Sequence, residues 1–298
     1  MPSSVLVATL VADAEAAPLS DARIDEAALA LGGIEQRRWL DEGRAADLVV
    51  TGGLAEKRAA FAAHFAGEAV DVIVQPLAGR EKKLIMADMD STLIGQECVD
   101  ELAAVVGLGD RVAAITERAM RGEIAFEPAL RERVALLKDL PLGVIADVLE
   151  SRIELNPGAR TLARTMRARG ARVVIVSGGF HQFTAAVAAL IGADEDRANT
   201  LRTADGKLTG EVEEPILGKD AKRAALVEIA ADMRLSLNET LAVGDGANDL
   251  AMLAAAGLGV AYRAKPQVAA VADARVDHSD LTALLYAQGV PRAAFVED

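Results

Sequence analysis

The stretch LIMADMDSTL, residues 84–93, decides how the rest of this chain is interpreted. Its first four residues, Leu84–Ala87, are apolar and fit one short buried β-strand, and two aspartates, Asp88 and Asp90, follow directly. Two carboxylates two residues apart at a strand end suit a site for a hard cation, with one carboxylate left to attack a substrate. The alternative is an acidic loop that caps the next helix through a hydroxyl side chain. The stretch therefore predicts a strand and nominates both aspartates for chemistry.

Downstream of this strand, apolar segments alternate with helical ones. The expected strands are Arg172–Val176, Thr240–Val243, Leu258–Ala261 and Ala274–Asp277. The expected helices are Gly158–Arg169, Gln182–Ile191, Asp220–Asp232 and Asn248–Ala255. This alternation predicts an α/β fold with a doubly wound parallel sheet of the Rossmann type. In such a sheet, binding and chemistry collect beyond the carboxyl ends of the strands.

Two insertions interrupt the α/β pattern. The first, at about residues 95–156, contains no evident strand and predicts a helical cap. Its helical segments are Cys98–Val106, Arg111–Arg121 and Ala129–Leu137. The second, Leu201–Leu217, has Asp205-Gly206 between two strand-like segments and predicts a small β-hairpin.

Residues 1–78 follow a different order of elements, strand-helix-strand-strand-helix-strand. The strand-like segments are Ser4–Val11, Ile34–Leu40, Asp47–Thr51 and Val70–Gln75, and the helical ones are Asp21–Leu31 and Leu54–Phe65. This order predicts a small ferredoxin-like α+β domain. The polar segment Pro76–Lys83 is the expected linker, so we divide the chain into domains at 1–78 and 79–298.

Composition narrows the classes of function. The chain has 298 residues, with 32 Lys+Arg against 45 Asp+Glu, so its formal net charge is 32 − 45 = −13. This acidic balance argues against partners that are nucleic acids or acidic membranes, because both attract clusters of Lys and Arg. The hydrophobic share of 52% and the charged share of 26% are typical of a globular protein that can bury a core.

Cysteine content and the uncharged runs bear on location. A single cysteine, Cys98, excludes an internal disulfide and a multi-cysteine zinc site, and we expect a cytoplasmic protein. We interpret Cys98 as a small buried residue and not as a nucleophile. The apolar start, residues 5–11, has no preceding positive residue and makes a poor signal peptide. The longest uncharged run, residues 173–193, contains Ser-Gly-Gly and is interpreted as strand, glycine loop and helix, not as a membrane span.

Three more polar clusters follow the later strands or lie on a helix. Ser177-Gly178-Gly179 offers a hydroxyl and free amides to an anion, although a glycine turn explains it equally well. Lys222 is, by itself, one cation among many. The hexapeptide at 244–249, GDGAND, combines two acids, an amide and two glycines, which suits a loop that holds a metal and a phosphate better than a routine turn.

Taken in order, the clusters resemble the four motifs of the haloacid dehalogenase superfamily of phosphotransferases, with Asp-x-Asp-x-Thr at 88–92 as the first. The resemblance runs from about residue 80 to the end and is greatest for the phosphoserine phosphatases. Glu97 and Arg133 stand where that subfamily has its substrate-binding Glu and Arg, and Lys222, not Lys219, fits the spacing to Asp245. Residues 1–78 are similar to ACT-type amino-acid-sensing domains, which implies a regulatory or dimerising module and is compatible with a homodimer.

The resemblance implies hydrolysis of O-phospho-L-serine to L-serine and phosphate, the last step of serine biosynthesis, through an aspartyl-phosphate. In it, Asp88 is the nucleophile and Asp90 the general acid and base. The implied cofactor is Mg²⁺, bound by the carboxylates of Asp88 and Asp245 and by the backbone carbonyl of Asp90. Asp249 supports a metal-bound water without touching the metal.

Substrate contacts are implied in the same way. Ser177, the Gly178 amide and Lys222 hold the phosphate oxygens, and Asn248 orients the phosphate.

Arg133 has the planar fork that suits the carboxylate of phosphoserine, and Glu97 can accept from its ammonium group. The alternative for both is a solvated helix charge. At the level of function, the alternatives are a phosphatase for another small metabolite, such as phosphohomoserine, and a non-catalytic amino-acid sensor.

Overall fold

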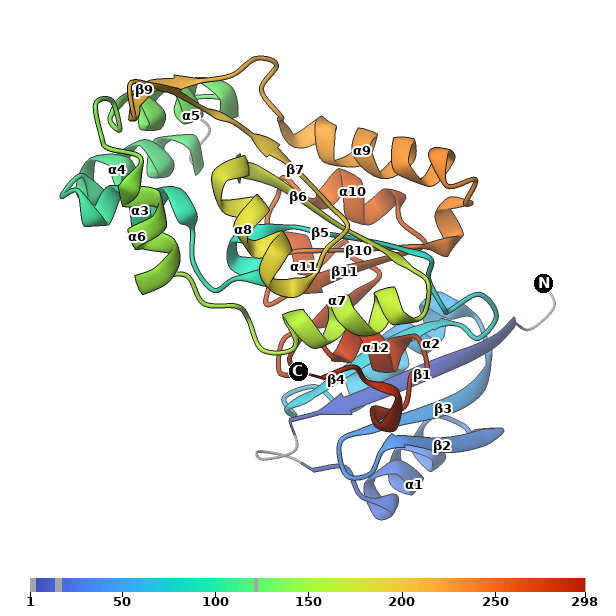
Figure 1. The fold of residues 1–298 in the computed structure, drawn as a ribbon. Helices are drawn as coiled ribbons and strands as arrows, with labels where there is room; N and C mark the ends of the chain where they lie inside the picture. The colour runs from blue at the N-terminus through green and yellow to red at the C-terminus, as the bar shows by residue number, and fades with distance from the viewer. Residues whose placement is uncertain (1–3, 14–17, 121–122, 298) are drawn as a thin grey trace.

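The computed structural model describes residues 4–13, 18–120 and 123–297. Two sheets organise these residues (Figure 1). A six-stranded parallel sheet with helices on both faces carries the larger part, and a four-stranded antiparallel sheet carries the smaller, N-terminal part. The predicted α/β fold with a preceding small α+β domain is confirmed.

The large sheet has the strand order β12-β11-β10-β5-β6-β7, and every neighbouring pair is parallel. Its strands are β5 (Leu84–Ala87), β6 (Arg172–Phe180), β7 (Glu195–Asn199), β10 (Thr240–Gly244), β11 (Leu258–Tyr262) and β12 (Ala274–Val276). Because side chains alternate along a strand, Ile85 and Ala87 of β5 face one helical layer and Leu84 and Met86 face the other. A strand buried on both faces must be apolar throughout, which is why Leu84–Ala87 was recognisable.

Helices cover the two faces. The first layer contains α7 (Ala159–Ala168), α8 (His181–Ile191) and α12 (Ala283–Ala287). The second contains α9 (Lys219–Asp232), α10 (Leu250–Ala255) and α11 (Pro266–Ala269). Among the helices that the structure describes, none is long and apolar enough to cross a membrane.

The structure differs from the sequence-based expectation in two strands. β6 continues in extended form through Ser177-Gly178-Gly179 to Phe180, where a glycine loop was predicted, and α8 begins at His181, one residue before its predicted start. β7, with the sequence EDRAN, was not predicted, because it is an edge strand without an apolar pattern.

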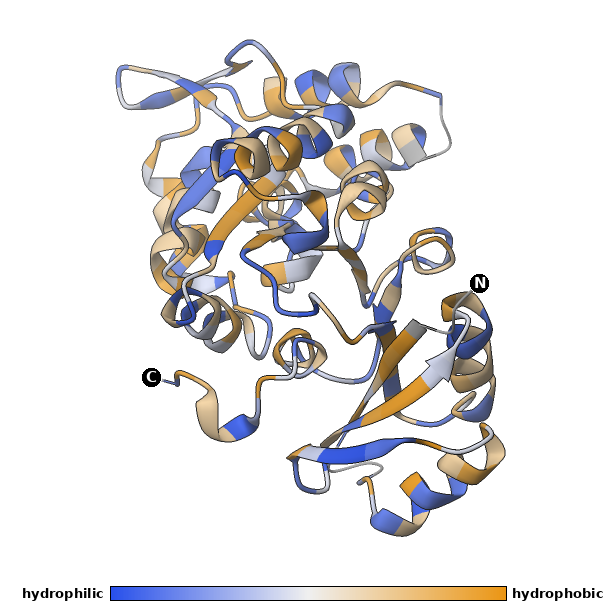
Figure 2. Cartoon of the chain, turned by 90° about the vertical axis from the view of Figure 1, so that its right-hand side faces the viewer, coloured by the Kyte–Doolittle hydropathy of each residue, from blue (hydrophilic) through white to orange (hydrophobic). Residues whose placement is uncertain are grey.

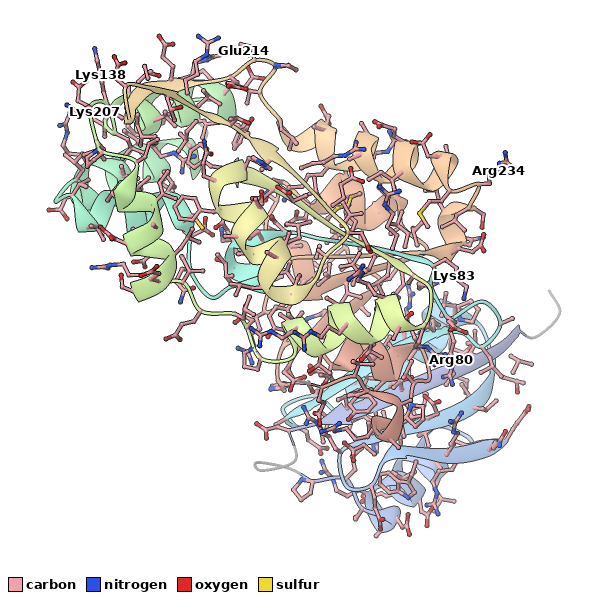
Figure 3. The ribbon with its side chains drawn as sticks, in the orientation of Figure 1. Arg80, Lys83, Lys138, Lys207, Glu214 and Arg234 are labelled. Carbon is pink, nitrogen blue, oxygen red and sulfur yellow. The ribbon has the colours of Figure 1, made fainter. Side chains whose placement is uncertain are left out.

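In the part of the predicted cap that the structure describes, the regular elements are helices. Its helices are α3 (Cys98–Val105), α4 (Gly109–Met120), α5 (Phe126–Ala135) and the unpredicted α6 (Gly143–Ser151); Arg121, predicted to end a helix, lies outside the described residues. The predicted hairpin, β8 (Leu201–Ala204) and β9 (Lys207–Val212), leaves the large domain and packs on α5 (Figure 1). A Cβ on Gly210 of β9 would lie 2.9 Å from the Cβ of Lys138, so the hairpin needs glycine there. Lys138, Lys207 and Glu214 mark this outer contact in Figure 3.

The small sheet has the antiparallel order β2-β3-β1-β4. Its elements are β1 (Ser4–Ala12), α1 (Asp21–Ala30), β2 (Gln36–Asp41), β3 (Ala45–Gly52), α2 (Leu54–His64) and β4 (Val70–Pro76). One face of the sheet forms a core of its own with the two helices, in which Leu10 and Leu48 meet Ile24 and Phe61. This is the split βαβ arrangement.

The opposite face of the small sheet packs against the large domain. Val11 and Ile73 belong to the same buried cluster as Tyr286 of α12, and the C-terminal segment lies beside the small sheet in both views (Figures 1 and 2). The buried carboxylate of Asp71 accepts hydrogen bonds from the main-chain amides of residues 277–279. The two parts therefore share an apolar and hydrogen-bonded interface.

The segment between the two sheets is anchored along its length. Arg80 pairs with the buried carboxylate of Asp47 at 2.7 Å, and the Lys82 ammonium donates to the Asn238 carbonyl at 2.7 Å. Figure 3 shows Arg80 and Lys83 where the chain passes from one part to the other. The connecting segment is therefore held in place by contacts with both parts.

Candidate active site

The carboxyl ends of β5, β6 and β10 meet below the cap, and a cavity of about 330 Å³ lies between them and the cap helices. Predicted site residues that line it from the sheet side are Asp88, Asp90, Ser177, Gly178, Asp245 and Asn248. Glu97 and Arg133 line it from the cap. Residues up to 160 positions apart in sequence are thereby brought together at one edge of the sheet, where the motif positions predicted them.

Asp88 lines this cavity and forms a buried ion pair with Lys222, which does not line it but lies in an adjoining pocket together with Gly178 and Asn248. The Lys222 ammonium lies 2.5 Å from Oδ2 of Asp88 and 2.7 Å from Oδ1 of Asp249. Burial alone would lower the pKa of Lys222, but the two carboxylates outweigh it and hold the pKa above its usual value. Burial raises the pKa of Asp88 well above its usual range, and Asp249 adds to this, while Lys222 opposes it. The amide of Asn248 approaches Oδ2 of Asp88 at 3.4 Å.

Two further carboxylates lie close to the carboxylate of this pair. Oxygen atoms of Asp88, Asp245 and Asp249 all lie within 4.8 Å of one another. Burial, followed by the charge of Asp249, raises the pKa of Asp245 to about 6. Among the described residues, the ion pairs of Lys222 go to Asp88 and Asp249, so the three carboxylates outnumber the ammonium group that pairs with them. Oxygen ligands with surplus negative charge fit a hard divalent cation.

Asp249 has a second contact that fixes it behind the cavity floor. It is fully buried, and its Oδ2 accepts a hydrogen bond from the main-chain amide of Gly246 at 3.0 Å. The nearby hydroxyl of Thr92 donates to Oδ1 of Asp245 at 3.2 Å. The loop that carries the acids is therefore held by its own main chain and by the residue that ends the first motif.

Asp90 points toward the cap and away from the acidic cluster. Its Oδ1 accepts a hydrogen bond from the main-chain amide of Cys98 at 3.0 Å, and its Oδ2 lies 3.4 Å from the Ser177 hydroxyl. Burial, with a contribution from Glu97, raises the pKa of Asp90 to about 6. A carboxyl group with a pKa near neutrality can both give and take a proton. The thiol of Cys98 is buried, which raises its pKa and keeps it unreactive.

The glycines after Ser177 lie close to side chains that line the cavity. A Cβ on Gly179 would lie 2.8 Å from Oδ2 of Asp90, and one on Gly178 would lie 3.3 Å from the ring of Phe126. The Gly179 amide donates to the Ser177 hydroxyl oxygen at 2.9 Å. The groups predicted to bind an anion therefore sit on the end of a strand, where the sequence suggested a glycine loop.

Arg133 and Glu97 face the same cavity from the cap. Glu97 accepts a hydrogen bond from the Ser91 hydroxyl at 2.8 Å. Arg133 makes only long contacts, at 3.4 Å to the Ala129 carbonyl and 3.5 Å to the Thr116 hydroxyl, and no carboxylate in the described part of the chain forms an ion pair with it. Burial lowers the pKa of Arg133, and Asp100 opposes this most. The guanidinium therefore has hydrogen-bond capacity to spare.

Sequence reasoning missed several residues of this cavity. Lys265 lines it from the loop after β11, and its amide donates to the Asp245 carbonyl at 3.3 Å. The other residues were predicted because they follow the ends of strands. The same criterion would have identified Lys265, since Lys265 closely follows Tyr262, the last residue of β11. Phe126 lines the cavity from the first position of α5, where nothing in the sequence distinguishes it from an ordinary helix residue.

Comparison with known proteins agrees with the fold. The model of the haloacid dehalogenase-like hydrolase family matches residues 85–254, and the chain belongs to this family. A phosphoserine phosphatase of Mycobacterium tuberculosis is 48% identical over 229 residues, which cover 76% of this chain and 56% of that protein. The predicted resemblance to phosphoserine phosphatases is thereby confirmed.

Two solved structures match almost the whole chain. A HAD-family hydrolase of Salmonella enterica serovar Typhi has a TM-score of 0.85 at 28% identity, over 95% of this chain and 97% of that one. A probable phosphoserine phosphatase of Vibrio cholerae has a TM-score of 0.77 at 31% identity, over 98% of this chain and 88% of that one. The chain spans 56% to 63% of the length of the first three curated relatives it matches.

Proposed function

We propose that this protein is a Mg²⁺-dependent phosphatase that hydrolyses O-phospho-L-serine to L-serine and phosphate. The observation that carries the proposal is that one cavity has different groups at its two ends. Asp88 and Ser177 line its sheet side, where Lys222 pairs with Asp88, and offer a site for phosphate. Arg133 and Glu97 offer opposite charges at the cap. Phosphoserine has a phosphate at one end and a carboxylate with an ammonium group at the other.

Asp88 is the proposed nucleophile. Its carboxylate oxygen forms a bond to phosphorus while the bond from phosphorus to the serine oxygen breaks, which gives an aspartyl-phosphate. Asp90 gives its proton to the departing serine oxygen, and its pKa of about 6 supports this role. Asp90 then takes a proton from water, the water oxygen bonds to phosphorus, and the bond to Asp88 breaks to release phosphate.

Positive charge must balance the phosphate oxygens throughout. Lys222 and the hydroxyl of Ser177 supply charge and a hydrogen bond, together with the Gly178 amide, and Asn248 orients the phosphate. The carboxylates of Asp88 and Asp245 and the carbonyl of Asp90 would hold Mg²⁺, which when bound neutralises phosphate charge and aligns the ester. Asp249 would support the ion's water without touching the ion.

The remaining parts of the proposal concern the organisation of the chain. We assign residues 79–298 to the phosphatase domain and residues 1–78 to an ACT-like regulatory or dimerisation domain, supported by a separate core under its two helices. We also place the protein in the cytoplasm and in serine biosynthesis. The buried free Cys98 agrees with a reducing compartment.

A phosphate-release assay tests the function. We expect turnover of phosphoserine well above that of phosphohomoserine, phosphoethanolamine and sugar phosphates, and loss of turnover without a divalent cation. A higher kcat/KM on another monoester would refute the substrate assignment. Absence of turnover on the whole panel, with the fold intact, would refute the proposal that the protein is a phosphatase.

A further inference from the structure

Asn199, the last residue of β7, joins two segments that carry proposed phosphate-binding residues. Its side chain is buried, with 3% exposure. The Nδ2 atom donates to the Gly178 carbonyl at 2.9 Å and to the Leu217 carbonyl at 3.4 Å, and Oδ1 accepts from the Leu217 amide at 2.6 Å. One carboxamide thus bridges the end of β6 and the start of the segment that leads into α9.

The contact with Gly178 fixes the hydroxyl of Ser177. The peptide unit between Gly178 and Gly179 is planar, so its carbonyl and its amide move together. The carbonyl accepts from Asn199, and the amide at the other side of the plane donates to the Ser177 oxygen at 2.9 Å. The pairing of β6 with β7 shifts register between Val176 and Phe180, which leaves this peptide outside the regular ladder. The Asn199 side chain holds it instead.

The contact with Leu217 fixes the start of α9. Asn199 exchanges two hydrogen bonds with the main chain of Leu217, as a neighbouring strand would. Gly218 follows as the N-cap of α9 and offers no side-chain cap, and Lys222 lies in the first turns of the helix. The position of the Lys222 ammonium therefore depends on where Asn199 holds Leu217.

We infer that Asn199 is a positioning residue that sets the spacing between Ser177 and Lys222 and so shapes the phosphate-binding site. It touches no substrate and acts through the Gly178–Gly179 peptide and Leu217. The inference rests on the proposed function in that Ser177 and Lys222 are taken to hold phosphate. Misplacement of binding groups by about 1 Å can cost on the order of 100-fold in rate.

The chain offers a matched control in Gln182. The side chain of Gln182 forms two hydrogen bonds with the main chain of Leu201, two residues beyond Asn199. Its Nε2 donates to the Leu201 carbonyl at 3.0 Å, and its Oε1 accepts from the Leu201 amide at 3.3 Å. Gln182 therefore forms the same kind of side-chain to main-chain hydrogen bonds as Asn199. These two hydrogen bonds go to Leu201, whereas those of Asn199 go to Gly178 and Leu217. Gln182→Ala reports the structural cost of losing such hydrogen bonds.

The experiment measures binding of inorganic phosphate to the full-length, Mg²⁺-loaded protein by titration calorimetry, with phosphoserine kinetics alongside. For Asn199→Ala and for Asn199→Asp, which keeps the acceptor for Leu217 but loses the donor to Gly178, we expect the phosphate dissociation constant to rise about tenfold or more and kcat to fall at least as much. Gln182→Ala should change both by less than about threefold. Melting temperatures show that each variant is folded, and Asn199→Ser replaces any variant that is not.

Phosphate affinity unchanged in the folded Asn199 variants would overturn the inference. Equal losses in the Gln182 and Asn199 variants would also overturn it, since they would show a merely structural role. Failure of the proposed function looks different. In that case the wild-type chain binds phosphate and the Asn199 variants bind it more weakly, but neither the wild type nor any variant releases phosphate from phosphoserine.

Discussion

Arg133→Ala tests whether the cap recognises the amino-acid end of the substrate. Arg133 contributes little to the fold, because its two hydrogen bonds are long and no described carboxylate pairs with it. Its removal should therefore leave stability close to that of the wild type. In the substrate complex, the alanine would leave the carboxylate of phosphoserine without its charged partner.

The magnitude follows from the loss of one partner of a desolvated charge pair, which costs on the order of 2–5 kcal/mol. The lower end of that range corresponds to about a 30-fold decrease in kcat/KM, since each 1.4 kcal/mol is tenfold. We expect at least this decrease on phosphoserine. On phosphoethanolamine, which lacks the carboxylate, the decrease should be much smaller.

Arg131 on the same helix provides the control. It is half exposed and pairs with Glu214 outside the cavity, so Arg131→Ala should leave kcat/KM on both substrates unchanged. Phosphate release over a range of substrate concentrations measures all of these values. Equal losses on phosphoserine and phosphoethanolamine in Arg133→Ala would refute the reasoning and assign Arg133 to the cap or the phosphate.

Three further predictions concern the nucleophile, the metal and the domain interface. Asp88→Asn removes the attacking charge, so activity should fall to background while circular dichroism shows an intact fold; near-normal turnover would contradict the mechanism. Treatment with a chelator should abolish phosphate release and added Mg²⁺ should restore it, and activity that survives exhaustive chelation would contradict the metal requirement. A fragment that begins at Gly79 uncovers apolar surface around Tyr286 that Val11 and Ile73 cover in the whole chain. Exposing one large apolar side chain costs about 1.5–3 kcal/mol, so the fragment should melt at a lower temperature than the full chain, and an equal melting temperature would show that the interface adds no stability.

The sequence was most informative where burial is complete. Leu84–Ala87 has the same bounds in the structure as in the prediction, because a central parallel strand must be apolar on both faces. The motifs behind such strands could be placed together from their positions in the sequence, since the carboxyl ends of parallel strands share one edge of the sheet. Glu195–Asn199 escaped prediction for the opposite reason. It is a hydrophilic edge strand whose position is set by pairing with β6, so the role of Asn199 had no local signal.

The docking of the small domain does have a signal in the sequence of β1. The run of apolar residues in this strand is almost continuous, whereas a sheet with one solvated face alternates apolar and polar residues. In the structure Leu10 faces the helices of the small domain and Val11 faces the large domain. Periodicity shows that a second face is buried, but it cannot name the surface that covers it. That surface is α12 and the residues after β12, more than 200 positions away.

The two ends of the proposed site come from different parts of the structure. Asp88 and Asp245 directly follow central strands and Ser177 lies within another, and both faces of these strands are buried, so the packing of the core fixes the positions of the three residues. Glu97 and Arg133 lie on the cap, which joins the core through two adjacent chain crossings held by the pairing of Ile94 with Leu155. The Cys98 amide at the start of the cap donates to Asp90 on the core side. A displacement of the cap would therefore move Glu97 and Arg133, proposed to face the amino acid, and change the hydrogen bonding of Asp90, the proposed general acid, while the proposed phosphate site on the core stays in place.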